Sequence, residues 1–217
     1  MDKIAVDEVE TAKRQSIIDA CLEMNRLGIN QGTSGNISVR HEDHLLVTPT
    51  GVPYPDLKPE SIVRLAFDGS WCGPLRPSSE WRFHRDIMQA RPDIDAIVHT
   101  HPPYATIIAI MGLNIPPIHY MIAAAGSDHI KCARYATFGT EELSRNAVKA
   151  LEGSHACLLE HHGLIVVAKS LVRALWLSVE VETLARQFHG AMQIGIPRLL
   201  SKEEIARVMA KMESLAH

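Results

Sequence analysis

Residues 96–103 read Ala-Ile-Val-His-Thr-His-Pro-Pro. The apolar, β-branched start of this segment predicts a buried strand, and the two prolines end that strand and can begin a helix. Within the strand, His99 and His101 lie two positions apart and so share a face, where their rings can converge on one ion. An isolated His-x-His is more often a pair of surface or satisfied histidines. The run therefore predicts a strand-to-helix unit and makes a metal site a hypothesis.

Elements on both sides of this run extend an α/β pattern. Apolar residues at helical spacing over 9–27 precede Gly28, which suits a left-handed C-terminal cap. Ser79 predicts the N-cap of a helix over 80–90, and Ser201 begins a capping box before a final amphipathic helix. A further helix is predicted over 171–188, and strands over 37–39, 45–47, 62–67, 156–159 and 165–168. With no repeat or linker, we expect a single domain over residues 1–217.

The composition excludes several classes of protein. The 217 residues carry a formal charge of -3, so no field attracts a polyanion, and we expect no nucleic-acid or anionic-membrane partner. A charged N-terminus without a signal-peptide core, and no run of about 18 apolar residues, predict a cytoplasmic protein. Four scattered cysteines fit buried reduced thiols, so histidines and carboxylates must supply any metal ligands.

A second histidine pair, His161-His162, precedes Gly163 at the predicted end of a strand. Adjacent strand residues point to opposite faces, so the residues alone do not decide which of the two joins a metal site. Glu80 adds a carboxylate, and His84, one helical turn later, either orients that carboxylate or lies on the helix surface. Three histidines and one acid are what a catalytic zinc site requires.

Three segments rich in hydroxyl groups and glycine are candidates for an anion pocket: residues 32–36, 48–51 and 77–79. Hydroxyls, an amide and closely approaching backbone N–H groups can hold an anion without net positive charge. Ordinary glycine-rich turns are the alternative interpretation. If the three segments surround one cavity, a phosphate would lie beside the metal.

Seven runs, taken in order, resemble the class II sugar-phosphate aldolase and epimerase family. They are Gln31–Asn36, Thr48–Gly51, Pro77–His84, His99–His101, Ile118–Gly126, Tyr135–Thr140 and His161–Leu164. The similarity extends from about residue 17 to residue 191. It implies the fold of that family, a single three-layer α/β/α domain with a mixed, mostly antiparallel central sheet.

The resemblance also implies roles for the matched residues. It implies a zinc ion, or another divalent ion such as Mn²⁺ or Co²⁺, held by His99, His101, His162 and Glu80. The histidine directly before the glycine is the family ligand, which selects His162. The implied phosphate site comprises Thr33, Gly35, Asn36, Thr50, Gly51, Ser78 and Ser79. Tyr120 is implied to reach an adjoining subunit's site in a homotetramer with active sites at its interfaces, and Phe138 to line an aldehyde pocket.

The implied activity is cleavage of a ketose 1-phosphate to dihydroxyacetone phosphate and an aldehyde, with Glu80 and Tyr120 as catalytic residues. Glu80 would exchange a proton with carbon, and Tyr120 would handle the proton of the C4 hydroxyl. Implied substrates are L-fuculose 1-phosphate, or 5-deoxyribulose 1-phosphate and 5-methylthioribulose 1-phosphate in a salvage pathway such as methionine salvage. The tail ends at His217 without the tyrosine that closes over the aldehyde in the family, which leaves the aldehyde open.

Two other functions fit the same resemblance. A sugar-phosphate 4-epimerase would run the same cleavage and re-add the aldehyde, but that branch generally has aspartate where this chain has Glu80. A non-catalytic scaffold would have no need of the metal site, so the retained histidines speak against it.

Overall fold

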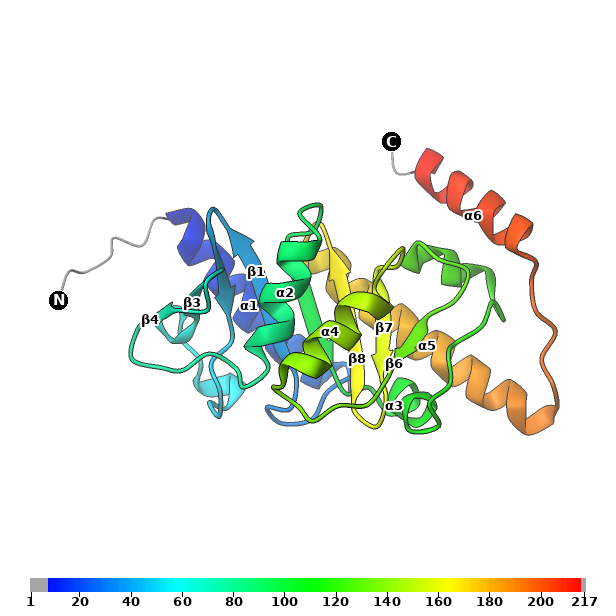
Figure 1. The fold of residues 1–217 in the computed structure, drawn as a ribbon, viewed down its shortest axis with the longest axis horizontal. Coiled ribbons are helices and arrows are strands. Elements are labelled where there is room, and N and C mark those ends of the chain that lie inside the picture. Colours follow the sequence, from blue (N-terminus) through cyan, green and yellow to red (C-terminus); the bar gives the residue numbers. More distant parts are fainter. Residues whose placement is uncertain (1–7, 216–217) are drawn as a thin grey trace.

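The computed structural model describes residues 8–215, which form an eight-stranded sheet between two layers of helices (Figure 1). The strand order is β4-β3-β2-β1-β5-β8-β7-β6, with β6 and β7 parallel and the other six neighbouring pairs antiparallel. The strands are β1 (Asn36–His41), β2 (His44–Val47), β3 (Val63–Ala66), β4 (Trp71–Cys72), β5 (Ala96–Thr100), β6 (Lys131–Ala133), β7 (Ala156–Leu159) and β8 (Gly163–Ala168). The three-layer architecture with a mixed, mostly antiparallel sheet is confirmed.

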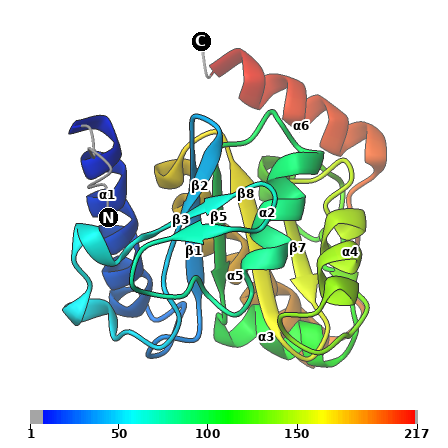
Figure 2. The same cartoon turned by 60° about the vertical axis from the view of Figure 1, so that its left-hand side comes forward.

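The helices divide between the two faces of the sheet. They are α1 (Glu8–Arg26), α2 (Trp81–Ala90), α3 (Pro103–Ile110), α4 (Glu141–Ala150), α5 (Leu171–Ile194) and α6 (Lys202–Leu215), with short 3₁₀ helices η1 (Tyr54–Asp56), η2 (Pro59–Ser61) and η3 (Tyr120–Ala125). Figure 2 shows α1 and α4 on opposite sides of the sheet. Each face of the sheet has its own hydrophobic core, and successive side chains of β5 point into opposite cores. Val98 packs with α1, α3 and α5, while Ile97 packs with α2 and α4.

Several predicted element ends are confirmed and others shift. Gly28 has φ +69°, so the left-handed cap after α1 is confirmed. Ser201 Oγ accepts the Glu204 N–H at 3.2 Å, which confirms the start of α6. The prediction of Ser79 as an N-cap is wrong: Glu80 occupies that position, and its carboxylate does not cap α2. The physical reason is that this side chain is held by groups outside the helix, described below.

The last helix packs on its own domain rather than standing free. Ile205 is fully buried, and Val208, Met209 and Met212 pack against the core at helical spacing. The backbone N–H of Leu200 donates to the carbonyl of Pro117 at 2.9 Å, which fixes the chain between α5 and α6. This packing places α6 against η3.

The four cysteines are free. Cys21 and Cys157 are buried, which confirms the expectation for these two, and Cys132 is half-buried. The expectation is wrong for Cys72, which is exposed because it lies in the two-residue edge strand β4. Among residues 8–215, no helix has both the length and the apolar character needed to span a bilayer. The predicted absence of a signal peptide concerns residues that lie largely outside this range.

A buried ion-pair cluster joins α1 to β3. Glu10 is 1% exposed, and its Oε1 accepts from Arg14 Nε at 2.8 Å and from Arg64 Nε at 2.7 Å. Burial by itself would raise the pKa of Glu10, but the hydrogen bonds and charges of Arg64 and Arg14 lower that pKa to about 2. The carboxylate is therefore ionised in the folded protein at neutral pH.

Replacing Glu10 with glutamine is expected to lower the free energy of unfolding by about 3 kcal/mol, because two largely buried guanidinium groups lose their counter-charge. The carboxyl has a pKa of about 2 in the folded protein and near 4.5 otherwise. Its stabilisation is therefore complete above about pH 4.5 and is lost as the pH falls toward 2. Urea unfolding at about pH 7 and pH 3 should show that wild type and Glu10→Gln differ less in their free energy of unfolding at the lower pH. Glu23→Gln, which breaks the exposed pair with Arg26, serves as the control, and a pH-independent difference would contradict the assignment.

Candidate active site

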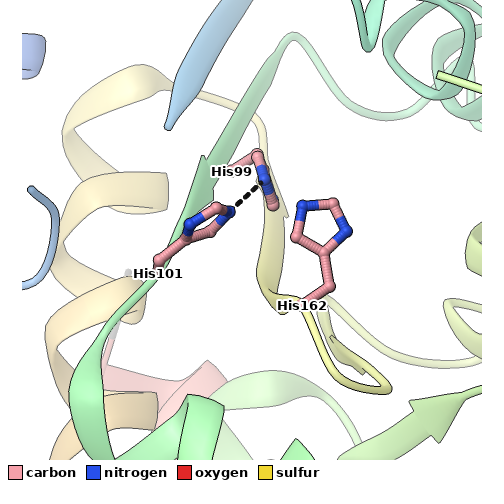
Figure 3. Close-up of side chains that lie close together, drawn as sticks. All are labelled: His99, His101 and His162. Carbon is pink, nitrogen blue, oxygen red and sulfur yellow. Dashed lines mark hydrogen bonds between the residues drawn. The ribbon is translucent and has the colours of Figure 1, made fainter. Parts of the chain in front are cut away.

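Three histidines converge at one end of β5 (Figure 3). His99 lies on β5 and His101 follows it, while His162 lies in the turn between β7 and β8. Antiparallel pairing of β5 with β8 sets His99 opposite Ile165, which brings this turn to the same end of the sheet as His101. Glu80, at the start of α2, completes the group from the face that α2 covers.

The distances within this group fit a bound divalent metal ion. The Nε2 atoms of His99 and His101 are 3.0 Å apart. His99 Nε2 lies 3.2 Å from Glu80 Oε2, and His162 Nε2 lies 3.3 Å from Glu80 Oε1. Ligands about 2.0–2.1 Å from a tetrahedral zinc ion are about 3.3 Å from one another, so these separations suit a metal site. The buried Glu80 Oε1 has no hydrogen-bond partner among the described residues, as a metal ligand would.

The protonation of the histidines also suits metal binding. His99 Nδ1 lies 3.0 Å from the carbonyl oxygen of Leu164 and donates its proton there, which fixes the ring with Nε2 toward the site. Burial, followed by the charge of His99, lowers the pKa of His101 to about 3 and that of His162 to about 4. Both rings are therefore neutral at pH 7, the form in which imidazole binds a metal.

The Glu80 carboxyl is ionised in this environment. Burial alone would raise its pKa, but the charge and hydrogen bond of His99, the charge of His162 and the hydrogen bond from Asn36 together lower it below its usual range. The side chain is only 5% exposed. A buried carboxylate among imidazole rings can serve both as a metal ligand and as a proton acceptor.

Two glycines allow the site segments to approach β5. A Cβ atom at Gly35 would lie 2.6 Å from the carbonyl oxygen of His99, and one at Gly163 would lie 2.7 Å from His101 Cδ2 and from the Thr100 carbonyl oxygen. Any larger residue would push these segments away from the histidines. Gly35 therefore has a packing role in addition to its predicted place in the phosphate loop.

A cavity of about 490 Å³ opens beside the histidines. It is lined by Thr33, Ser34, Ser79, Glu80, His101, Tyr135, Ala136, Phe138, His161 and His162. The structure thus brings the predicted Thr33, Ser79 and Phe138 to the candidate metal ligands. Tyr135 and His161, whose rings are 6.0 Å apart, were missed as lining residues, although both lie within the runs that carry the family resemblance.

The prediction that His161 and His162 point to opposite faces of a strand is wrong. His161 and His162 line the same cavity because they lie in a tight turn, in which His161 has φ +54°. Only His162 belongs to the cluster of potential metal ligands. The geometry therefore agrees with the choice of His162 that the family resemblance implied.

The remaining predicted phosphate residues do not line the cavity, but their loops lie side by side. The loop of Thr50 and Gly51 runs beside that of Ser78, because Thr50 N–H donates to the Arg76 carbonyl at 3.1 Å and Ser78 N–H to the Thr48 carbonyl at 2.9 Å. Thr48 Oγ1 in turn accepts the Ile37 N–H at 3.2 Å, beside Asn36. The three segments are therefore neighbours, and their role as a phosphate site stays a prediction.

Tyr120 and His84 have different surroundings from those of the ligands. Tyr120 begins η3, is half-exposed, and does not line this cavity within its own chain. His84 is fully buried, so the alternative of a helix-surface histidine is wrong. It contacts Asn36 rather than Glu80, with His84 Nε2 2.5 Å from Asn36 Oδ1.

Comparison with known proteins identifies the family. The model of the class II aldolase and adducin N-terminal domain matches residues 15–189. The chain belongs to this family. The chain is 50% identical over 203 residues to the 5-methylthioribulose-1-phosphate/5-deoxyribulose-1-phosphate aldolase of Rhodospirillum rubrum, covering 94% of this chain and 92% of that one. It is 51% identical over 201 residues to the L-fuculose phosphate aldolase of Escherichia coli, covering 92% and 94% respectively.

A solved structure supports the same assignment. An L-fuculose 1-phosphate aldolase superposes with a TM-score of 0.90 at 37% identity, over 92% of this chain and 95% of that chain. The protein is therefore a lyase with the class II aldolase fold. Class II aldolases depend on a metal ion, and the His99, His101 and His162 cluster with Glu80 is the candidate site for it.

Proposed function

We propose that this protein is a zinc-dependent aldolase that cleaves a ketose 1-phosphate to dihydroxyacetone phosphate and an aldehyde. The observation that carries the proposal is the convergence of three imidazole rings and the Glu80 carboxylate beside a cavity. Glu80, His101 and His162 line this cavity together with hydroxyl groups, and His99 lies buried behind them. The names of the relatives, which are aldolases of ketose 1-phosphates, support the same substrate class.

The chain's own groups account for the proton transfers. A bound divalent ion would polarise the C2 carbonyl of the ketose and lower the cost of the negative charge that develops as the C3–C4 bond breaks. Glu80, ionised in the resting site and lining the cavity, would take up a proton from water and deliver it to C3, which completes dihydroxyacetone phosphate and restores the carboxylate. Tyr120 would accept the proton of the C4 hydroxyl as its own phenol proton passes to water, and the C4 oxygen becomes the aldehyde carbonyl.

We assign the phosphate to the three neighbouring loops, in which Thr33, Gly35, Asn36, Thr50, Gly51, Ser78 and Ser79 supply hydroxyls, an amide and backbone N–H groups. The hydroxyls of Thr33 and Ser79 reach the cavity directly. One Nδ2–H of Asn36 is used by Glu80, and its second hydrogen would serve the phosphate.

Thr33→Ala is expected to raise KM for a ketose 1-phosphate about tenfold with little change in kcat, because a hydrogen bond to a charged group contributes about 1.5 kcal/mol or more. Steady-state kinetics with phosphorylated and unphosphorylated forms of one ketose would measure this. An equal loss of kcat/KM on the unphosphorylated ketose would argue against a phosphate contact at Thr33.

We propose a homotetramer in which Tyr120 of one subunit completes the site of the next. The half-exposed ring and its position outside the cavity of its own chain support this arrangement. Exposed apolar side chains near the end of α5, including Ile194 and Ile196, support burial against another copy. Sedimentation equilibrium should give four times the chain mass of 24.0 kDa.

The aldehyde product is best identified by direct assay. Zinc-loaded protein would be given L-fuculose 1-phosphate, 5-deoxyribulose 1-phosphate or 5-methylthioribulose 1-phosphate, and dihydroxyacetone phosphate would be measured. An aldehyde screen in the synthetic direction then ranks the products, and the Tyr135 and Phe138 rings beside the cavity favour aldehydes with an apolar end. Interconversion of pentulose 5-phosphates without dihydroxyacetone phosphate would indicate a 4-epimerase, and failure to bind any divalent ion would indicate a scaffold.

A further inference from the structure

Four buried polar side chains form one line of hydrogen bonds that ends on the Glu80 carboxylate. Ser38 Oγ lies 2.7 Å from His84 Nδ1, and His84 Nε2 lies 2.5 Å from Asn36 Oδ1. Asn36 Nδ2 then donates to Glu80 Oε2 at 2.9 Å. Ser38 and His84 are fully buried, and Asn36 and Glu80 are each 5% exposed. The line connects the interior of β1, through α2, with the cavity.

The direction of every hydrogen bond in this line follows from the bond between Asn36 and Glu80. Asn36 Nδ2 donates to Glu80 Oε2, so the same amide presents its oxygen to His84. His84 must then carry its proton on Nε2, and its Nδ1 must accept from the hydroxyl of Ser38. This requires a neutral ring, and burial lowers the pKa of His84 to about 3.

We propose that His84 is a positioning residue, which holds the Asn36 amide in the one orientation that fixes Glu80 Oε2 and leaves Oε1 facing His162. The inference rests on the proposed role of Glu80. Glu80 has no capping bond to α2 that would orient its side chain, and its Oε1 has no hydrogen-bond partner among the described residues. The Asn36 amide is thus the neutral group that holds one oxygen while the other is left for the metal and the substrate.

A histidine that only fills space would not need this arrangement. Both ring nitrogens of His84 are bonded, and the two partners lie on β1 at alternate positions, Asn36 and Ser38, whose side chains share one face of the strand. The ring therefore bonds to two side chains of one strand, and it fixes the orientation of the Asn36 amide that donates to Glu80. Preorganisation of this kind matters most for a group that must transfer a proton at a defined carbon.

The first test is the tautomer of His84 in the full chain. Nitrogen NMR of ¹⁵N-histidine-labelled protein should show His84 as the neutral Nε2–H tautomer in both the metal-free and the zinc-loaded protein. The His84→Gln variant identifies the His84 signals by their loss. A Nδ1–H tautomer or a charged ring at pH 7 would overturn the proposal, whatever reaction the enzyme catalyses.

The second test compares variants at His84 on α2 with a variant at Ser144 on α4. His84→Leu should lower kcat about 10- to 100-fold, the effect usual for partners of metal ligands, and change KM for the ketose 1-phosphate less than twofold. His84→Gln can still donate to Asn36 and accept from Ser38, so it should recover part of kcat. Ser144→Ala is the control, because it removes a partly buried hydrogen bond to Asp86 on α2 at 2.6 Å without touching the line of bonds. Equal kcat values in His84→Leu and Ser144→Ala would show that His84 has only a packing role and would overturn the proposal.

A third readout separates this inference from the proposed function. In cobalt-loaded protein, the visible absorption bands report how the ligands surround the ion, and they should change in His84→Leu but not in Ser144→Ala. If the wild type cleaves no ketose 1-phosphate but the spectrum still changes in His84→Leu, the proposed substrate is rejected and the positioning role is retained. An unchanged spectrum in His84→Leu would reject the positioning role.

Discussion

Replacing His162 with alanine is expected to weaken zinc binding by more than about 100-fold and to abolish most aldolase activity. Even outer partners of metal ligands contribute 10- to 100-fold to affinity, and a direct ligand contributes more. The structure places His162 Nε2 3.3 Å from Glu80 Oε1, within the cluster of ligating atoms. Loss of the ion should lower kcat by about 10³-fold, which corresponds to about 4 kcal/mol of charge stabilisation. Elemental analysis and a competing chelator would measure the affinity.

The neighbouring residue provides the matched control. His161 lies at the edge of the same cavity but outside the ligand cluster, and its φ of +54° is a conformation that asparagine adopts readily. His161→Asn should therefore retain zinc and the fold, with any effect confined to KM or to the choice of aldehyde. Full zinc occupancy in His162→Ala, or loss of zinc in His161→Asn, would contradict the assignment of His162 as the ligand.

Glu80→Gln is expected to lower kcat by about 10³-fold while the three histidines retain most of the metal. General acid–base groups contribute about 10²- to 10⁴-fold, and an amide cannot accept and return the proton at C3. The effect should also appear in a half-reaction, the exchange of the C3 hydrogen of dihydroxyacetone phosphate with deuterium in the solvent. NMR of dihydroxyacetone phosphate in D₂O measures this exchange without any aldehyde.

The same chemical change at a nearby carboxylate serves as the control. Glu160 lies beside the histidine pair, but its Oε2 accepts the Tyr135 N–H at 2.7 Å and its side chain does not line the cavity. Glu160→Gln should leave the exchange rate within a few-fold of wild type. Exchange in Glu80→Gln at the wild-type rate, with zinc still bound, would remove Glu80 from the proton transfer.

Much of the architecture could be predicted from local patterns. The apolar start of residues 96–103 and its two prolines predicted β5 and the start of α3, and both are observed. Gly28 and Ser201 marked the end of α1 and the start of α6, because each meets a local backbone requirement. The start of α2 was misplaced by one residue, since the side chain at its N-cap is held by a hydrogen bond from Asn36 on β1 and not by the helix.

The candidate site was predictable in its chemistry and less so in its geometry. The spacing of His99 and His101 made their convergence a hypothesis, and their Nε2 atoms do meet, although His101 lies just after the end of β5. The same reasoning failed for His161 and His162, because a tight turn rather than a strand carries them. Nothing in the spacing of Ser38, Asn36 and His84 indicated that they join one line of bonds, since 46 to 48 residues separate the His84 ring from its partners along the chain.

The sequence by itself determined most element types, the residue types available as metal ligands and the absence of a strong net charge, because these depend on residue type and on neighbours a few positions away. Only the tertiary structure decided which of the 12 histidines meet. Antiparallel pairing brings the β7–β8 turn to His99, and the close approach permitted at Gly35 and Gly163 closes the gap. Those contacts join segments about 60 residues apart, and their geometry arises from packing two faces of one sheet at once.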